Sequence, residues 1–493
     1  MTPEYDAIIV GAGFGGMGAA IQLSRLGITD LAILEREDDL GGTWHVNRYP
    51  GLAVDIASVT YSYSFEPNPY WSRVFAPGAE LKRYAEHVAD KYGLRRYMRF
   101  GTVVDAAAWD DRTGTWTVQI HGGERLTARY LVTATGFLSQ PRMPDIPGVD
   151  AFAGKVIHST DWDDTYDLTG RRAAVIGTGA TAVQLVPEVA KQVAELTVYQ
   201  RTPIWVTPKL DGPIPQSVQR LFARVPFAQR AARMLNTALL EAIMVTGALR
   251  YRQARLTNQG AEALSRAHLR RQIKDPDLRR KLTPDYTFGC KRPTFSNDYF
   301  PTFNRPHVHL ETTPIAHIEP TAIVTADGHR TEIDTLLLAT GFNLWDANFP
   351  AIRVTGRENR DLGTWWRDNR FQAYEGVTIP YFPNMISLNS PYSYSGLSYF
   401  TTIETQMRHM ARLFGEVHRR GVTTFEVTET ANDAFLARMR ALLGDSVFEL
   451  GSCATARSYY FNPHGEAALL RPTSTVNARR AAGTFPLTDY AYA

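Results

Sequence analysis

The chain has 493 residues, of which 44% are hydrophobic and 21% charged, and its formal net charge is +3. This length is too great for one hydrophobic core, so we expect two or three domains of an ordinary globular protein. The small net charge argues against a dedicated nucleic-acid binder, because such proteins need a strongly basic surface to follow phosphates.

The two cysteines, Cys290 and Cys453, lie far apart in the sequence and form no CxxC pair. Their spacing indicates neither a disulfide framework, nor a zinc site, nor a redox dithiol, so we expect no metal and no disulfide. A reducing cytoplasm fits this cysteine usage best.

No targeting or membrane segment is expected. The N-terminus leads directly into an apolar strand, without the basic start or small-residue cleavage site of a secretory signal. The longest apolar stretch, about 234–249, is too short to span a bilayer and contains Asn236 and Glu241.

The first elements predict a βαβ nucleotide-binding unit. An apolar strand over 7–10 leads into Gly11-Ala-Gly-Phe-Gly-Gly16, a helix follows to about residue 26, and a second strand over 31–34 ends at Glu35. A GxGxxG turn alone is a weak signal, but here the strand, the helix and the following acid are all present. Gly11, Gly13 and Gly16 allow a pyrophosphate to approach the helix N-terminus, and Glu35 can accept a hydrogen bond from a ribose hydroxyl.

The next stretch reads as a Pro- and aromatic-rich loop region over 49–77, followed by a helix near 79–92. Two strands near 102–109 and 115–120 come next, and a buried strand over 130–135 runs into Gly136.

A second unit of the same design follows, with a strand over 173–176, the turn Gly177-Thr-Gly-Ala-Thr-Ala182, a helix, and a strand over 196–199. Arg201 stands where the first unit has Glu35. A carboxylate there would repel the 2′-phosphate of NADP, whereas a guanidinium can bind it with two hydrogen bonds. We therefore predict FAD at the first turn and NADPH at the second, with a solvated strand-end arginine as the alternative for Arg201.

An arginine-rich helical segment interrupts the second unit over about 209–284. Arg220, Arg224, Arg230 and Arg233 recur near helical spacing between apolar residues, which is typical of a solvated face on an amphipathic helix. A weak peripheral membrane contact is the alternative. A later strand over 335–338 leads into a second Ala-Thr-Gly-Phe sequence, so we expect the chain to return to its first domain.

The predicted fold is α/β, with two Rossmann-like dinucleotide-binding domains and a helical insertion in the second. We expect the first part of the FAD domain over 1–140, a linker over 141–170, the NADP domain over 171–335, and the rest of the FAD domain with a C-terminal segment over 336–493.

The linker reads Phe152-Ala-Gly-Lys-Val-Ile-His158-Ser-Thr-Asp-Trp162-Asp163, which fits the pattern FxGxxxHxxxW followed by Pro or Asp. In these residues, with Phe152, Gly154, His158 and Trp162 at the fixed positions, the chain resembles the type I Baeyer–Villiger monooxygenases. Trp162 distinguishes this pattern from that of flavin monooxygenases that oxidise nitrogen or sulfur. For His158 the preferred interpretation is a hydrogen-bonded structural histidine that orders the linker.

The resemblance extends over nearly the whole chain, and the sequence is similar to the phenylacetone and cyclohexanone enzymes of that family. The matching segments include residues 41–44, 47–51, 200–203 and 290–292. It implies FAD contacts from Thr43, Trp44, Asp55, Tyr61 and Val104. It implies NADPH contacts from Thr178, Gly179, Ala180, Thr181, Gln184, Arg201, Thr202 and Lys291.

Arg292 and Asp55 are the catalytic pair that the resemblance implies. A guanidinium keeps its proton at any working pH and can stabilise an oxyanion, and an ion pair with Asp55 would fix it. A plain structural salt bridge, and a solvated Lys291, are the alternatives.

The activity implied is the NADPH- and O2-dependent insertion of one oxygen next to a ketone carbonyl by a C4a-peroxyflavin, giving an ester or lactone, with sulfides as further substrates. A flavin N- or S-oxygenase and a flavoprotein reductase are the alternatives. The loop over 389–399 and Trp205 are candidates for the pocket wall. Tyr459 takes the place of a family tryptophan that helps to hold the nicotinamide nucleotide.

Overall fold

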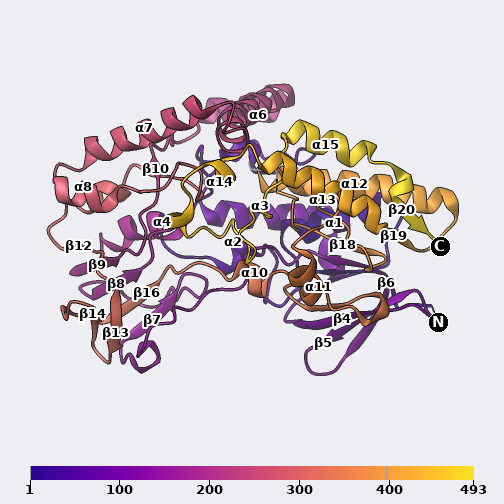
Figure 1. Cartoon of the computed structure of the whole chain (residues 1–493), viewed down its shortest axis with the longest axis horizontal. Coiled ribbons are helices and arrows are strands. Elements are labelled where there is room, and N and C mark those ends of the chain that lie inside the picture. Colours follow the sequence, from indigo (N-terminus) through magenta and orange to yellow (C-terminus); the bar gives the residue numbers. More distant parts are fainter. Residues whose placement is uncertain (1, 395–397) are drawn as a thin grey trace.

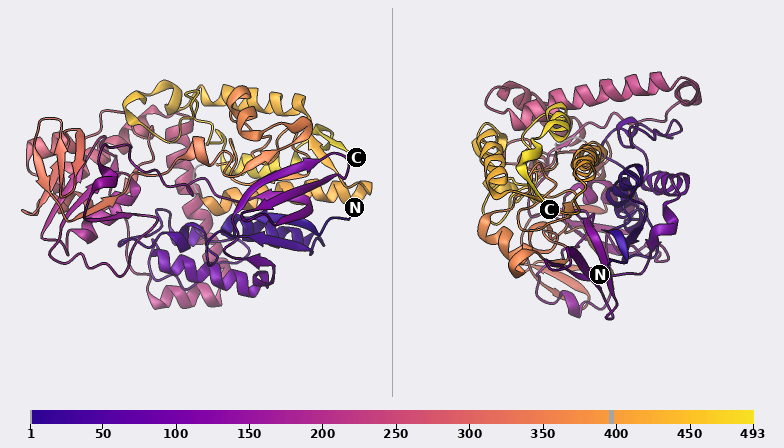
Figure 2. Two further views of the ribbon diagram at one scale, coloured as in Figure 1. Left: turned by 90° about the horizontal axis from the view of Figure 1, so that it is seen from below. Right: turned by 90° about the vertical axis from the view of Figure 1, so that its right-hand side faces the viewer.

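Each of the two glycine turns follows a strand of a separate sheet, and the two sheets form the two lobes of the molecule (Figure 1). The computed structural model describes residues 2–394 and 398–493. Both chain ends lie at the same end of the first lobe (Figures 1 and 2).

The first sheet has the strand order β17-β4-β5-β6-β1-β2-β3, with β18 paired to β6. Its strands are β1 (Tyr5–Val10), β2 (Leu31–Leu34), β3 (Met98–Arg99), β4 (Val104–Asp110), β5 (Thr115–Ile120), β6 (Arg125–Thr133), β17 (Arg353–Thr355) and β18 (Met385–Ser387). β1 is parallel to β2 on one side and to β6 on the other, with Val10 opposite Leu34 and Thr133. Because the carboxyl ends of parallel strands meet at one edge, the first glycine turn and Glu35 lie together there.

Helices from both ends of the chain cover this sheet, and α1 and α12 pack against each other. The longer ones are α1 (Phe14–Arg25), α3 (Gly78–Lys91), α11 (Leu362–Asn369), α12 (Tyr399–Arg420), α13 (Glu429–Leu443) and α15 (Thr475–Thr484). Shorter elements are α2 (Thr43–Val46), η1 (Ser58–Thr60), η2 (Leu94–Tyr97), α10 (Leu344–Ala347), η5 (Arg357–Asn359), α14 (Val447–Leu450), η6 (Ala454–Ala456), η7 (Leu487–Asp489) and the hairpin of β19 (Phe425–Val427) with β20 (Tyr490–Tyr492).

The second sheet is parallel throughout and has the order β12-β9-β8-β16-β7. Its strands are β7 (Lys155–His158), β8 (Arg172–Ile176), β9 (Glu195–Tyr199), β12 (Val308–Glu311) and β16 (Thr335–Leu338). The expected linker therefore supplies β7, the edge strand of this sheet. The sheet extends to Leu338, since β16 pairs with β7 on one side and with β8 on the other. Around it lie η3 (Val149–Ala151), α4 (Ala180–Val189), α9 (Tyr299–Thr302) and a small sheet of β13 (Ile315–Glu319), β14 (Ala322–Thr325) and β15 (Arg330–Glu332).

The insert forms a helical layer along one edge of both lobes (Figure 1). It contains α5 (Gln216–Arg224), α6 (Pro226–Leu240), the π-helix η4 (Glu241–Leu249), α7 (Arg255–Gln272) and α8 (Pro276–Leu282), between the paired β10 (Val206–Thr207) and β11 (Thr294–Phe295). The expectation of a solvated arginine face is met by Arg220, Arg224 and Arg230, which are exposed, but it is wrong for Arg233. Arg233 points inward and donates to the Ser62 carbonyl at 2.8 Å, while apolar side chains of α6 face outward.

The apolar helical stretch is also longer than expected, since it begins at Pro226 rather than near 234. Among the described residues, the helix Pro226–Leu249 is long and apolar enough to cross a membrane by length and composition alone, with 18% of its most apolar window buried. One such helix is weak evidence for a span.

Cys290 and Cys453 form a disulfide, with their Cα atoms 5.2 Å apart and 163 residues between them in sequence. The expectation of no disulfide is wrong, because spacing along the chain says nothing about cysteines that the fold brings together. The bond ties the segment ahead of Lys291 to the C-terminal segment that carries Tyr459.

Candidate active site

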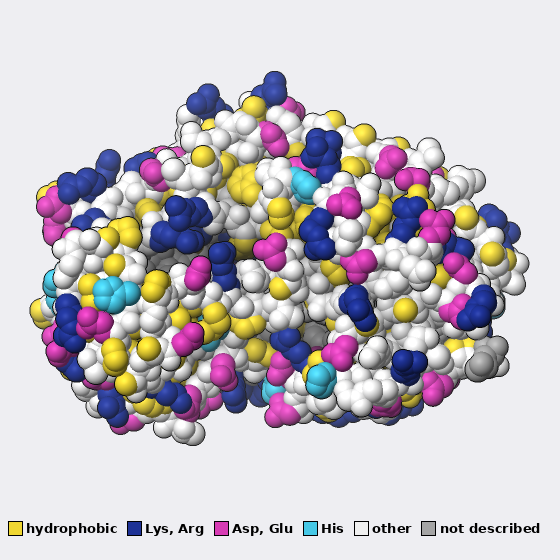
Figure 3. All heavy atoms as spheres, turned by 60° about the horizontal axis from the view of Figure 1, so that its bottom comes forward, with side chains coloured by type: hydrophobic (Ala, Val, Ile, Leu, Met, Phe, Trp, Pro, Cys, Tyr) yellow, Lys and Arg dark blue, Asp and Glu magenta, His cyan; other side chains and the backbone are white. Residues whose placement is uncertain are grey.

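A cavity of about 1740 Å³ lies between the lobes, and both glycine turns line it. Pockets for one small molecule are commonly roughly 300–1,000 Å³, so this one has room for two large ligands. Figure 3 shows lysine and arginine side chains gathered beside a hollow in the surface. The described residues contain no group of three or more His, Cys, Asp or Glu side chains that could hold a metal.

The first glycine turn is packed too tightly for side chains. Gly11 has φ +108°, and a Cβ there would lie 2.6 Å from the Ala134 carbonyl oxygen. Gly16 lies behind the turn, where a Cβ would lie 1.9 Å from the Gly11 carbonyl oxygen, and it does not line the cavity. α1 begins after Gly13 without a side-chain cap, so its first N–H groups remain available to an anion.

Glu35 is buried at the end of β2 and lines the cavity. Its Oε2 accepts from the Ala12 N–H at 2.6 Å and its Oε1 from the Glu37 N–H at 3.1 Å. Each carboxylate oxygen has a second acceptor position, so the orientation that these bonds fix still allows a ribose hydroxyl to bind. The other residues expected around FAD also line the cavity: Thr43, Trp44, Asp55, Tyr61 and Val104.

The second turn repeats this geometry. Gly177 has φ +120°, and a Cβ there would lie 2.3 Å from the Ala339 carbonyl oxygen. α4 follows Gly179, again without a side-chain cap. Thr178 Oγ1 donates to the Thr202 carbonyl at 2.7 Å, which ties the turn to the end of β9. Thr178, Gly179, Ala180, Thr181, Arg201, Thr202 and Lys291 all line the cavity.

Gln184 is the exception among the residues expected around NADPH, because its side chain does not reach the cavity. Its Nε2 donates to the Ala53 carbonyl at 2.9 Å, and its Oε1 accepts from Tyr49 Oη at 3.1 Å. Position 184 lies one helical turn beyond the start of α4, so the side chain faces the loop of the first lobe. Gln184 therefore ties α4 to the loop that carries Asp55.

Four cations gather where NADPH is expected: Arg142, Arg201, Lys291 and Arg457 all line the cavity. Burial and the nearby Arg201 lower the pKa of Lys291 to about 8. Burial, Arg457 and Arg142 lower the pKa of Arg201. None of the four forms an ion pair with any residue over 2–394 or 398–493. This uncompensated positive charge fits a phosphate.

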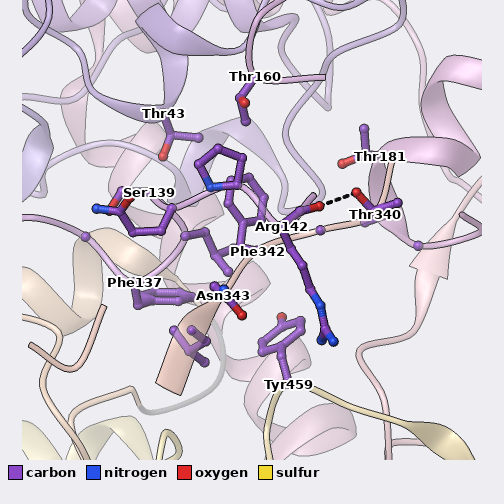
Figure 4. A pocket seen from close by; sticks show the side chains of 18 of the residues that line it. Thr43, Phe137, Ser139, Arg142, Thr160, Thr181, Thr340, Phe342, Asn343 and Tyr459 are labelled. Atoms are coloured by element: carbon purple, nitrogen blue, oxygen red, sulfur yellow. Dashed lines mark hydrogen bonds between the residues drawn. The ribbon is translucent and has the colours of Figure 1, made fainter. Parts of the chain in front are cut away.

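Sequence reasoning missed two of these cations. Figure 4 shows the Arg142 side chain directed toward Tyr459, while the Arg142 backbone carbonyl accepts a hydrogen bond from Thr340 Oγ1. Arg142 and Arg457 belong to no local motif, so only the folded chain brings them beside Arg201.

Arg292 and Asp55 form a two-pronged ion pair on the cavity wall. Arg292 Nε lies 2.8 Å from Asp55 Oδ2, and Nη2 lies 3.0 Å from Oδ1. Burial acts to lower the pKa of Arg292, but Asp55 together with the neighbouring Tyr394, Tyr460 and Tyr459 outweighs it, so that pKa lies well above its ordinary value. Nη1 lies 3.5 Å from Tyr394 Oη. The site thus holds a permanently charged guanidinium in one orientation.

The linker motif lies behind the cavity wall, since Phe152, Gly154, His158 and Trp162 do not line it. Phe152 and Trp162 are buried in the cores of the second lobe, and a Cβ on Gly154 would lie 2.4 Å from the Asp334 carbonyl oxygen. His158 Nδ1 bonds Thr160 Oγ1 at 2.8 Å, and Thr160 lines the cavity. Burial lowers the pKa of His158, which favours a neutral ring that orients Thr160.

Only some of the aromatic residues expected at the pocket wall line the cavity. Tyr459, Tyr394 and Tyr399 line the cavity, whereas Ser395, Gly396 and Leu397 of the expected loop lie outside the described residues. Trp205 does not line the cavity, because its ring packs against Tyr286 and Phe288, and its Nε1 donates to the Tyr286 carbonyl.

The family model, the relatives and the solved structures to which this chain is similar are oxidoreductases. The family described as pyridine nucleotide-disulphide oxidoreductase matches residues 8–225. A Baeyer–Villiger monooxygenase of Streptomyces coelicolor is 37% identical, over 98% of this chain and 91% of its own. One of Pseudomonas aeruginosa is 38% identical, over 98% and 90%. The crystal structure of the OTEMO complex with FAD and NADP superposes with a TM-score of 0.88 at 28% identity, covering all of both chains.

Proposed function

The chain belongs to the Baeyer–Villiger monooxygenases, and from that premise we propose how its own residues serve the reaction. It is an FAD-containing, NADPH- and O2-dependent oxidoreductase that inserts one oxygen atom next to a ketone carbonyl to give an ester or lactone. The observation that carries the residue assignments is the single cavity in which both glycine turns and the Arg292–Asp55 pair meet.

Bound NADPH supplies the electrons and bound FAD the activation of O2. The residues around the first turn hold FAD: Gly11, Gly13, Glu35, Thr43, Trp44, Tyr61 and Val104, with Gly16 allowing the close packing. The residues around the second turn hold NADPH: Thr178, Gly179, Ala180, Thr181, Arg201, Thr202 and Lys291. Arg142 and Arg457 complete the charge around the 2′-phosphate, which fits their place beside Arg201.

Arg292 is the catalytic residue. Attack on a ketone carbonyl places negative charge on the carbonyl oxygen, and a fixed guanidinium stabilises that charge without losing a proton. Asp55 acts as a positioning residue, because its two oxygens hold two nitrogens of the guanidinium and leave Nη1 free of the pair. Tyr459 lines the cavity, and in the place of the family tryptophan it would help to hold the nicotinamide nucleotide.

We keep the domain division that the sequence predicts, and the separation of the strands into two sheets supports it. The FAD domain takes residues 1–140 and the C-terminal part after 336, the linker 141–170 contributes β7, and the NADP domain covers 171–335 with its insert at about 209–284. β16, a strand of the second sheet, ends at Leu338, a few residues beyond the expected end of the NADP domain at residue 335. We propose a cytoplasmic location because NADPH is supplied there; cysteine usage no longer supports it, since a disulfide such as Cys290–Cys453 is uncommon in a reducing compartment. We also expect sulfides as secondary substrates.

A ketone panel tests the function. The purified flavoprotein is incubated with NADPH, O2 and linear, cyclic and aryl ketones, while NADPH consumption and ester yield are followed together. Ester formation that matches NADPH consumption is the expected result. Turnover of amines and sulfides without any ester, or oxygen-independent reduction of an added acceptor, would favour an N- or S-oxygenase or a reductase instead.

A further inference from the structure

The helix α6 has its polar side against the protein and its apolar side outward. Gln229 is 3% exposed and donates to the Asn68 carbonyl at 2.7 Å. Arg233 donates to the Ser62 carbonyl at 2.8 Å and Asn236 to Thr60 Oγ1 at 3.2 Å. These three residues follow helical spacing, so they form one face of α6, and that face is hydrogen-bonded to the first lobe.

The opposite side of α6 is apolar and exposed. We call it the outer face, defined by Phe227, Met234, Leu235 and Leu239 of α6 together with Ile243 of the adjoining η4; the first three are 77%, 72% and 74% exposed. Residues 210–264 hold ten of the sixteen exposed large hydrophobic side chains among the described residues. A helix on a water-soluble surface shows the reverse arrangement, so the outer face requires an apolar environment.

Positive charge surrounds the outer face. Arg220 and Arg224 on α5 and Arg230 on α6 are exposed, and residues 216–240 include no aspartate or glutamate. Within the described parts of the chain these three arginines form no ion pair. Two copies of this face placed against each other would bring like charges together, which disfavours a symmetric dimer through it.

We infer that the outer face of α6 binds the surface of a bilayer that contains anionic lipids. Apolar side chains enter the boundary between head groups and acyl chains, and Arg220, Arg224 and Arg230 bind lipid phosphates and carboxylates. The helix lies in the plane of the membrane and does not cross it, because its inner face is bonded to the first lobe. Its continuation η4 is also fixed there, since Glu241 accepts from the Thr475 N–H at 2.7 Å.

The position of α6 suits this role. The helix lies along the outer edge of the molecule, at the top of the right-hand view in Figure 2, where nothing else in the described chain covers its outer face. Its inner face contacts Thr60 and Ser62, and Tyr61 between them lines the cavity. A bound membrane would therefore lie one helix away from the cavity wall.

Vesicle flotation of the holoenzyme tests the inference. Vesicles of equal parts phosphatidylcholine and phosphatidylserine should carry the protein upward, whereas vesicles of phosphatidylcholine alone should carry far less. The double variant Phe227→Ser/Leu235→Ser should remain at the bottom, and the matched control Met143→Ser/Leu442→Ser, which changes two exposed apolar residues elsewhere, should float like the parent. Flavin content checks that each variant is folded.

The charge is tested separately. Arg220→Gln, Arg224→Gln and Arg230→Gln should each weaken binding roughly fivefold, and binding should weaken with added salt. The inference is overturned if the parent protein does not float with anionic vesicles or if the two double variants behave alike. It is also overturned if Phe227→Ser/Leu235→Ser converts a dimer to a monomer in light scattering, because the outer face would then be a subunit interface.

Discussion

Replacing Arg201 by alanine should weaken NADPH binding and leave NADH binding nearly unchanged. Arg201 lies on the cavity wall beside Lys291, Arg142 and Arg457, and the ribose 2′-phosphate is the only group by which the two nucleotides differ. A hydrogen bond to a charged group contributes about 1.5–3 kcal/mol, which is roughly tenfold to 150-fold in affinity. Because Arg142, Lys291 and Arg457 remain beside the site, the lower end applies, about tenfold.

The assay is the rate of flavin reduction measured by stopped-flow absorbance against NADPH or NADH concentration. Arg220→Ala, which removes an exposed arginine of α5 outside the cavity, serves as the matched control and should not change the preference. An unchanged preference for NADPH in Arg201→Ala would refute the assignment of this cation to the 2′-phosphate.

Three further results are expected. The pKa of Lys291 is about 8, and a bound phosphate would raise it, so NADPH affinity should fall as the pH rises above about 8. Lys291→Arg should remove this loss of affinity, because an arginine keeps its proton. A loss of equal size in Lys291→Arg would contradict the assignment. Cleaving the Cys290–Cys453 disulfide should cost about 2–5 kcal/mol of stability. Dithiothreitol should therefore lower the melting temperature of the parent protein but not that of Cys290→Ser/Cys453→Ser. Equal shifts in the two proteins would argue against the bond. Gln184→Leu removes the hydrogen bonds to Ala53 and Tyr49 that tie α4 to the loop carrying Asp55. The ester yield per NADPH should therefore drop, while the KM for NADPH stays constant. A raised KM with full ester yield would instead make Gln184 a cofactor ligand.

The elements that place the cofactors could be read from the sequence. The strands expected over 31–34, 115–120 and 335–338 are found with those bounds, because short buried strands have continuous or alternating apolar patterns. The glycine turns, Glu35 and Arg201 were likewise recognisable, since each stands at a fixed distance from a strand.

The remaining features depend on contacts between distant segments, which no local pattern records. Arg142 of the linker and Arg457 of the C-terminal segment come near Arg201 only when these two segments meet at the cavity. The partner of Cys290 is 163 residues away. The period of α6 predicts a helix but not which face meets the protein, and here hydrogen bonds to the first lobe turn the polar face inward.

The central claim is that Arg292, held by Asp55, stabilises the charge that forms when the ketone is attacked. The most direct measurement compares flavin reduction with ester formation in Arg292→Ala. The account predicts that this variant binds FAD and is reduced by NADPH at nearly the parent rate, yet forms at least a hundredfold less ester, in the range found when an oxyanion-stabilising donor is removed. Ester formation within a few fold of the parent would contradict it.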